Sequence, residues 1–302
     1  MNIVLIFQIF VIAFALIFSI VLIKDIIDNK QELKSKGWVN LSIAAIVTQF
    51  FDTLGIGSYG TLTAWFKITK AVPDKKIPGT LNTCTVVSCA FMTVAYTTTI
   101  EVEIATLLVP VVTSTIGAFV GASVISKLPV NKIRYGMAVA LIAVAVIMVL
   151  RQFDIFPVGG EAIGLSAGKL VIVGIISLIL GALMTIGVGI YAPMMALVFL
   201  MGLSPDVAYP IMMGSCAFLI PTAGIKFIMA SRKTGEAKYD RKSAICVNYI
   251  GCIGVAIAVF IITSIPMDVL KWIIVAVLTY TSIALILDAR KDSKAAQLNQ
   301  NA

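Results

Sequence analysis

The chain has 302 residues, of which 60% are hydrophobic and only 13% are charged, and its mean hydropathy is +1.04. Soluble globular proteins carry about 25% charged residues, so this composition excludes an ordinary soluble domain and indicates several membrane spans. The formal net charge of +8 does not imply a nucleic-acid partner, because basic residues on a multispanning protein mark its cytoplasmic loops.

Histidine is absent from the chain. Its absence excludes Ser–His and Cys–His catalytic pairs, histidine metal ligands and histidine proton relays. The five cysteines lie in apolar stretches without a C-x-x-C spacing, which predicts buried thiols and no metal site. The only serine beside the first glycine cluster, Ser58, does not lie in a G-x-S-x-G motif. We therefore expect neither an enzyme nor a bound cofactor.

The apolar stretches, taken in chain order, predict an all-α polytopic membrane protein. A retained N-terminal span is expected at 3–23, because no cleavage site follows it. The next apolar region is broken by glycines, and three full spans follow it; after a Gly-rich linker the same order is repeated. The expected units are an N-terminal helix and loop (1–37), a first repeat (38–150), a linker (151–168), a second repeat (169–288) and a tail (289–302). The first repeat has its broken region at 38–66 and spans at 77–98, 104–126 and 135–150. The second has its broken region at 169–202 and spans at 207–230, 244–264 and 270–288.

One short motif occurs twice at a constant spacing. Thr-Leu-Gly-Ile-Gly-Ser-Tyr at 53–59 is matched by Thr-Ile-Gly-Val-Gly-Ile-Tyr at 185–191, and adding 132 to a residue number converts the first copy into the second. The same spacing pairs several downstream positions: Pro73 with Pro205, Asp74 with Asp206, Pro78 with Pro210 and Cys84 with Cys216. A fixed period of this length indicates an internal duplication.

The distribution of Lys and Arg favours broken regions that turn back within the membrane. If both regions crossed it, fifteen of the 23 basic residues would lie in the cytoplasm; if both are re-entrant hairpins, twenty would. Each repeat then has an odd number of crossings, so the two repeats are inverted. The N-terminus is expected outside a plasma membrane and the C-terminus in the cytoplasm. The entry arm at 38–54 is longer than half the bilayer, so it must tilt or the tips must pass one another.

Inverted repeats with broken helices are typical of secondary transporters. The backbone amides at the start of a helix after each break form an anion site. We expect the substrate to contact Gly55, Gly57, Ser58, Tyr59, Gly60 and Thr61 in the first repeat, and Gly187, Gly189, Ile190, Tyr191 and Ala192 in the second. Kinks at Pro78 and Pro210 are expected to bring Asn82, Thr83 and Ser215 to the same place. The alternative is that the glycines only permit close helix packing.

Asp52 is the ionisable residue that stands out inside the spans. A carboxylate at this depth suggests coupling to H⁺ or Na⁺, or a lock on the hairpin tip. The second repeat has Met184 at the equivalent position, so the role of Asp52 is not shared by both repeats.

The segment from Asp52 to Gly60 (DTLGIGSYG), with IPGTLN at 77–82, GVGIYAP at 187–193 and GLSPD at 202–206, resembles the sulfite exporter TauE/SafE family of membrane transporters. The resemblance covers about 38–288. It implies export of sulfite, an organosulfonate or a related small sulfur-containing anion. The family commonly has a denser glycine run at the tip, whereas this chain has Ser58 and Tyr59 in the first copy and Ile190 and Tyr191 in the second. An anion channel, a carrier of a small carboxylate or other non-sulfur anion, and a homo-oligomeric assembly remain open.

Overall fold

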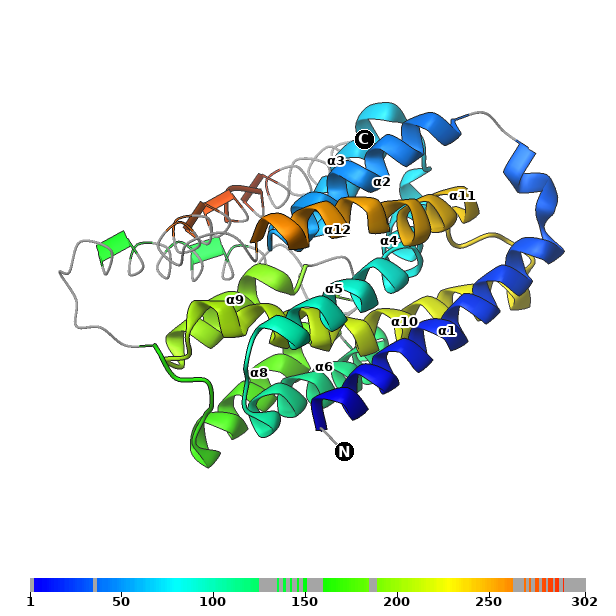
Figure 1. Ribbon diagram of the computed structural model, residues 1–302. Helices are drawn as coiled ribbons and strands as arrows, with labels where there is room; N and C mark the ends of the chain where they lie inside the picture. The colour runs from blue at the N-terminus through cyan, green and yellow to red at the C-terminus, as the bar shows by residue number, and fades with distance from the viewer. Residues whose placement is uncertain are drawn as a thin grey trace.

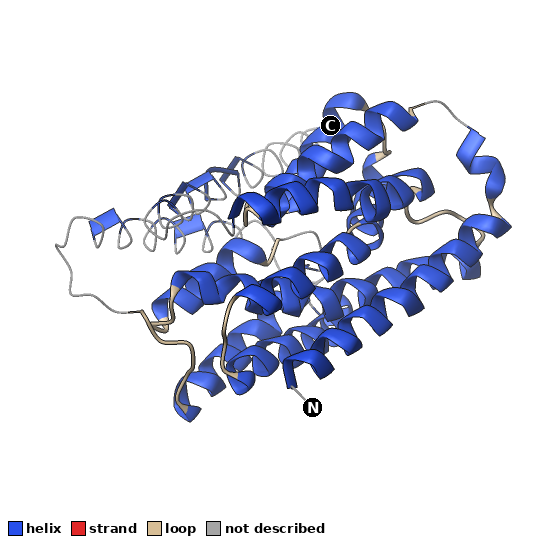
Figure 2. Ribbon diagram, viewed as in Figure 1, coloured by secondary structure: helices blue, strands red, loops and turns tan. Residues whose placement is uncertain are grey.

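The computed structural model describes residues 3–34, 37–124, 160–184 and 189–262, with scattered residues between 135 and 150 and between 269 and 290. In these parts the chain is a bundle of helices joined by short loops (Figures 1 and 2). The expected spans at 135–150 and 270–288, most of the linker and most of the tail lie outside the described residues.

The first part of the chain begins with α1 (Ile3–Asp28) and a short 3₁₀ helix, η1 (Lys30–Lys34). The expected first broken region consists of α2 (Trp38–Thr53) and α3 (Ser58–Thr69), separated by residues 54–57. The helices that follow are η2 (Asp74–Lys76), α4 (Ile77–Cys84), α5 (Val86–Thr99) and α6 (Ile104–Val124).

The second part repeats this order of elements where it is described. The expected second broken region contains α8 (Ala167–Met184) and α9 (Tyr191–Leu200). They are followed by η4 (Pro205–Val207), α10 (Ala208–Thr234), α11 (Arg241–Ile245), the π-helical turn η5 (Cys246–Ile250) and α12 (Gly251–Ile262).

Four continuous helical stretches among the described residues are long and apolar enough to span a membrane: 4–28, 167–184, 208–234 and 241–261. The pair α4 and α5 makes a fifth if it is counted as one span bent by 41°. The protein is therefore a multi-pass membrane protein.

The helices α2 and α3 lie side by side as a helical hairpin (Figure 1). Trp65, near the end of α3, donates its indole N–H to Oδ1 of Asn40, near the start of α2, at 3.1 Å. Because this bond joins the outer ends of the two helices, the chain returns to the end of the molecule from which α2 started.

The helices α8 and α9 also fold back on each other. Lys169, near the start of α8, donates from Nζ to the carbonyl oxygen of Met201, just after α9, at 2.8 Å. Closer to the turn, Ser177 Oγ lies 3.8 Å from the sulfur of Met194. The second broken region is therefore a hairpin as well.

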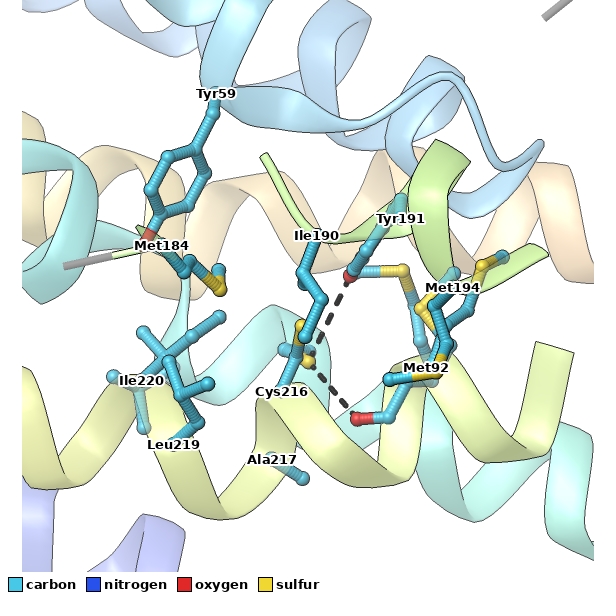
Figure 3. Packing of buried hydrophobic residues seen from close by; sticks show 14 of the residues in the cluster. Tyr59, Met92, Met184, Ile190, Tyr191, Met194, Cys216, Ala217, Leu219 and Ile220 are labelled. Carbon is cyan, nitrogen blue, oxygen red and sulfur yellow. Dashed lines mark hydrogen bonds between the residues drawn. The ribbon is translucent and has the colours of Figure 1, made fainter. Parts of the chain in front are cut away.

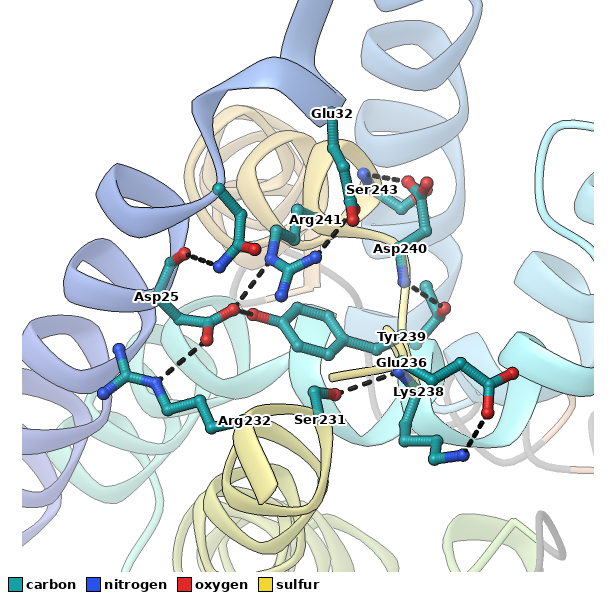
Figure 4. Close-up of polar contacts among 12 residues, drawn as sticks. Asp25, Glu32, Ser231, Arg232, Glu236, Lys238, Tyr239, Asp240, Arg241 and Ser243 are labelled. Atoms are coloured by element: carbon teal, nitrogen blue, oxygen red, sulfur yellow. Dashed lines mark hydrogen bonds and ion pairs between the residues drawn. The ribbon is translucent and has the colours of Figure 1, made fainter. Parts of the chain in front are cut away.

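The two hairpins open toward opposite ends of the bundle. At one end, Asp25 of α1 binds Arg241 at 2.8 Å (Figure 4), and Lys75, which follows α3, binds Glu236 at 3.2 Å. At the other end, the amide of Leu165, just before α8, donates to Glu103, which precedes α6. We call these the Asp25 end and the Glu103 end. The first hairpin starts and finishes at the Asp25 end, and the second at the Glu103 end.

The region expected as one span at 77–98 is broken at Thr85, between α4 and α5. Asn248 of η5 bridges this break: its Oδ1 accepts from the amide of Val87 and its Nδ2 donates to the carbonyl of Thr83, both at 2.8 Å. Backbone groups freed inside a membrane need such partners. The side-chain amide of Asn248 supplies them from another helix.

The predicted kinks at Pro78 and Pro210 were wrong. Pro78 lies in the first turn of α4 and Pro210 in the first turn of α10, which then continues unbroken to Thr234. A proline in the first turn removes an N–H that has no partner within the helix, so it causes no break. The helix expected at 77–98 is broken at Thr85 instead.

Candidate functional site

The first hairpin turns at two glycines with left-handed backbone angles. Gly55 has φ of +91° and Gly57 has φ of +87°. Side chains disfavour this region of φ, so glycine is the residue that permits the turn. A Cβ on Gly55 would also come within 2.9 Å of Met195 Cε. The glycines at this tip are therefore required by its backbone conformation.

The carbonyl groups at this tip receive hydrogen bonds from tyrosines of two other helices. Tyr96 of α5 donates its hydroxyl to the carbonyl of Thr53 at 2.7 Å, and Tyr209 of α10 donates to that of Leu54 at 3.5 Å. The two phenol rings stack with centroids 4.9 Å apart. Together they fix the depth and orientation of the first tip.

The first amide of α3 is bound by the chain's own carboxylate. Oδ1 of Asp52, near the end of α2, accepts a hydrogen bond from the backbone N–H of Ser58 at 2.7 Å. Asp52 is 1% exposed. A negative charge is favourable at the positive end of a helix, so Asp52 occupies the kind of position that an external anion would take.

Two tyrosines at equivalent places in the two motifs point toward α10, near Cys216 (Figure 3). Tyr59 of α3 donates to Oδ1 of Asn82 at 3.0 Å, and Asn82 in turn donates to the carbonyl of Pro78. The hydroxyl of Tyr191, the first residue of α9, lies 3.8 Å from the thiol of Cys89. Both tyrosines are only 6% exposed. The centre between the hairpins is thus closed and lined by phenol, amide and thiol groups.

The tip of the first hairpin lies alongside the start of α9. A Cβ on Gly57 would lie 3.9 Å from Tyr191, while Gly55 lies against Met195, one turn further along α9. Tyr96 and Tyr209, which bind the first tip, are each within one turn of a helix end on the Glu103 side. With 16 residues, α2 is about 24 Å long. The first tip therefore lies close to the ends of α5 and α10 on the Glu103 side.

Other predicted site residues have local roles in the structure. The hydroxyls of Thr61, Thr83 and Ser215 each donate to a carbonyl three or four residues earlier in the chain, at distances of 2.8–3.3 Å. The structure therefore does not turn these hydroxyls toward the space between Tyr59 and Tyr191.

The second tip differs from the first in its backbone. Gly189 has no left-handed angle, and a Cβ there would meet nothing within 4 Å; the same is true of Gly60 in α3. Ile190 precedes α9 and is buried, and Ala192 lies in its first turn. Gly187 lies outside the described residues.

Sequence reasoning missed four residues: Gln49, Tyr96, Tyr209 and Asn248. All four are polar residues within apolar helices, and such residues in a membrane span need a partner. That signal was available in the sequence, but the identity of each partner depends on which helices are neighbours.

The arrangement of the first repeat can be compared with known families. Residues 2–148 match the sulfite exporter TauE/SafE family. The match runs from α1 through α6 and includes the first hairpin, Asp52 and the break at Thr85, so the predicted resemblance is confirmed over the first half of the chain. No curated protein and no solved structure gives a significant match to the chain. The TauE/SafE assignment supports a membrane transporter of sulfur-containing anions.

Proposed function

We propose that this TauE/SafE protein is a secondary transporter, working as an exporter, that binds a small sulfur-containing anion between the tips of the two hairpins. Sulfite and organosulfonates are the substrates we expect. One observation carries the proposal: two hairpins that open toward opposite ends bring Tyr59 and Tyr191 into the same buried centre. This is the arrangement in which transporters with inverted repeats hold their substrate.

The groups near the two tips suit an anion better than a cation. The first turns of α3 and α9 present backbone amides, which bind negative charge. The hydroxyls of Tyr59 and Tyr191 add donors on side chains that the helices hold in place. We assign substrate contacts to the amides of Ser58, Tyr59 and Gly60 and of Tyr191 and Ala192, together with the two phenols.

In the proposed membrane arrangement, both hairpins are re-entrant and the Asp25 end faces the cytoplasm. The helix ends and connections at this end carry Lys24, Lys30, Lys75, Arg232 and Lys233, and basic residues are concentrated on the cytoplasmic side of membrane proteins. Gln8 of α1 contacts Thr98, at the opposite end of the bundle. The N-terminus is then outside the plasma membrane.

Transport requires the site to open in turn toward each side. Asp52, Tyr59 and Tyr191 are all buried, so the structure corresponds to a closed state. We propose that one hairpin rocks against the other, with the glycine turn at 54–57 as the hinge of the first.

Binding is tested with purified protein in detergent. The melting temperature is measured in the presence of sulfite, sulfate, thiosulfate, methanesulfonate and acetate, because a ligand that binds only the folded state raises it. We expect the largest increase with a sulfur-containing anion, and a smaller one when Tyr59→Phe and Tyr191→Phe remove the two hydroxyls. Thr98→Val at the exposed end of α5 is the control. A shift with acetate alone would favour the alternative, a carrier of small carboxylates.

Flux through liposomes separates a carrier from an anion channel. We expect uptake of a labelled sulfonate to saturate with concentration and to be accelerated by unlabelled substrate on the opposite side. Uptake that rises linearly with concentration and shows no such exchange would contradict the carrier mechanism.

A further inference from the structure

The charge balance at the first tip points to the coupling ion. We propose that Asp52 takes up a proton when the substrate anion binds at the amide of Ser58, so that one proton and one anion cross the membrane together and export is driven by the outward concentration gradient of the anion. This inference rests on the proposed function and identifies the ion that moves with the substrate.

The first step is that the carboxylate and the substrate compete for the same place. Asp52 Oδ1 lies 2.7 Å from the amide nitrogen of Ser58, at the start of α3. An anion that used this amide would have to displace the carboxylate and remain beside it. Two negative charges within a few ångströms repel strongly in a medium of low dielectric constant. Protonation of Asp52 removes this repulsion and supplies an O–H that donates to the anion.

The second step is that no basic side chain can take the place of the proton. Within the parts of the chain that the structure describes, no Lys or Arg forms an ion pair with Asp52. The titratable groups that face Asp52 from the surrounding helices are phenols and thiols: Tyr59, Cys84, Tyr96, Tyr191 and Cys216. Phenols and thiols are ordinarily uncharged at neutral pH. The charge of an arriving anion is therefore balanced at Asp52 itself.

The third step distinguishes H⁺ from Na⁺. Sodium-coupled transporters hold the cation with backbone carbonyls of an unwound helix. At this tip those carbonyls already accept hydrogen bonds: that of Asp52 from the amide of Gly55, that of Thr53 from Tyr96 and that of Leu54 from Tyr209. Each of these three carbonyls keeps only one free lone pair, which makes the break a poorer cage for Na⁺ than an unwound helix with unbonded carbonyls and favours a proton as the coupling ion.

A second buried group marks the route by which the proton arrives. Gln49 lies on α2 one turn before Asp52, on the side toward the Asp25 end, and is 0% exposed. Neither its Nε2 nor its Oε1 has a hydrogen-bond partner among the described residues. A buried amide without partners costs about 1–3 kcal/mol, and buried waters commonly bind such groups. We assign to Gln49 the water that delivers the proton to Asp52.

Gln49 packs closely against the start of α12, beside a π-helical turn. Its Cγ would lie 2.7 Å from a Cβ on Gly251, so the glycine provides the space that this side chain occupies. Gly251 directly follows the π-helical turn η5. Single π turns inside α-helices are frequent at functional sites.

The coupling is tested in liposomes that contain a pH-sensitive dye. The probe is methanesulfonate, the anion of a strong acid, which carries no proton of its own near neutral pH. An imposed methanesulfonate gradient should move about one proton per anion through the wild-type protein. In Asp52→Asn we expect saturable anion flux with a proton-to-anion ratio near zero and no dependence on pH.

Asp206→Asn is the matched control. Asp206 also accepts a backbone amide at a helix start, that of Val207 at 3.1 Å, but it lies in the loop at the Glu103 end. This variant should keep the ratio of one. Gln49→Leu should also keep the ratio but slow the flux several-fold, without lowering the melting temperature.

The outcomes separate the coupling from the function. Absence of saturable methanesulfonate flux in the wild type would overturn the proposed function. Saturable flux that moves no protons would overturn the coupling and leave the function standing. If Asp52→Asn does not fold, the wild-type ratio decides the question alone. A flux that depends on Na⁺ would show that sodium, and not a proton, is the coupling ion.

Discussion

The side-chain oxygen of Asn248 accepts a hydrogen bond from the backbone amide of Val87, 161 residues earlier in the chain, at 2.8 Å. With the bond from its Nδ2 to the carbonyl of Thr83, this amide replaces the helical partners that the break at Thr85 removes. The chain can therefore bend by 41° between α4 and α5 in the interior of the bundle, close to Asn82, which binds Tyr59.

Replacing Asn248 should therefore destabilise the protein. Asn248→Leu preserves volume but leaves the amide of Val87 and the carbonyl of Thr83 unpaired, at a cost of about 1–3 kcal/mol for each. We expect a lower melting temperature in detergent, followed by tryptophan fluorescence. Thr99→Val, at the exposed end of α5, is the control. A melting temperature equal to that of wild type would show that the break does not depend on Asn248.

The backbone conformation of the first tip predicts that substituting Gly57 reduces transport, whereas substituting a glycine elsewhere in the bundle does not. Gly57→Ala forces a side chain into a left-handed conformation, which costs about 1–3 kcal/mol and displaces the first amides of α3. We expect anion flux to fall at least tenfold while the protein still inserts into the membrane. Gly168→Ala in α8, where a Cβ would meet nothing, should leave flux unchanged. Full flux in Gly57→Ala would show that transport does not depend on the backbone conformation of this tip.

The opposite openings of the hairpins predict a labelling pattern. Lys75 and Glu236 form an ion pair at the Asp25 end, whereas Glu161 lies near the Glu103 end. Cysteines placed at 75 and 236 should react with a membrane-impermeant reagent from the cytoplasmic side, and a cysteine at 161 from outside. Wild-type protein, whose cysteines are buried or half-buried, is the control. Labelling of positions 75 and 161 from the same side would contradict the re-entrant arrangement.

Two aspartates of α1 should differ in their effect on stability. Asp25 is fully buried and accepts hydrogen bonds from Arg232, Arg241 and Tyr239 (Figure 4). Asp25→Asn removes the fully buried carboxylate that pairs with the nearly buried Arg241, which costs about 3–5 kcal/mol.

Asp28 binds the same Arg232, but its side chain is 55% exposed. Asp28→Asn should therefore cost less than about 1 kcal/mol. The two free energies are compared by unfolding in detergent. Equal effects of the two substitutions would show that the buried ion pair adds nothing beyond a surface one.

The sequence alone predicted the features that depend on local composition and on the duplication. The apolar stretches marked the helices of the described part to within a few residues, with α1 and α10 running four or five residues further than expected. The repeated glycines marked the two hairpin turns, because the left-handed backbone angles of Gly55 and Gly57 favour glycine, whereas the break at Thr85 contains no glycine and was not predicted. The motif around Asp52 also identified the family that residues 2–148 match.

The tertiary structure decided which groups bind the backbone atoms that each break leaves without helical partners. The bonds from Tyr96 and Tyr209 to the first tip, and from Asn248 to Thr83 and Val87, join segments far apart in the chain. No local pattern encodes such pairings, because a backbone carbonyl or N–H at a break can pair with any donor or acceptor that a neighbouring helix presents. The same holds for Asp52: the sequence marked a buried carboxylate, and only the fold showed that it binds the amide of Ser58, where an anion would bind.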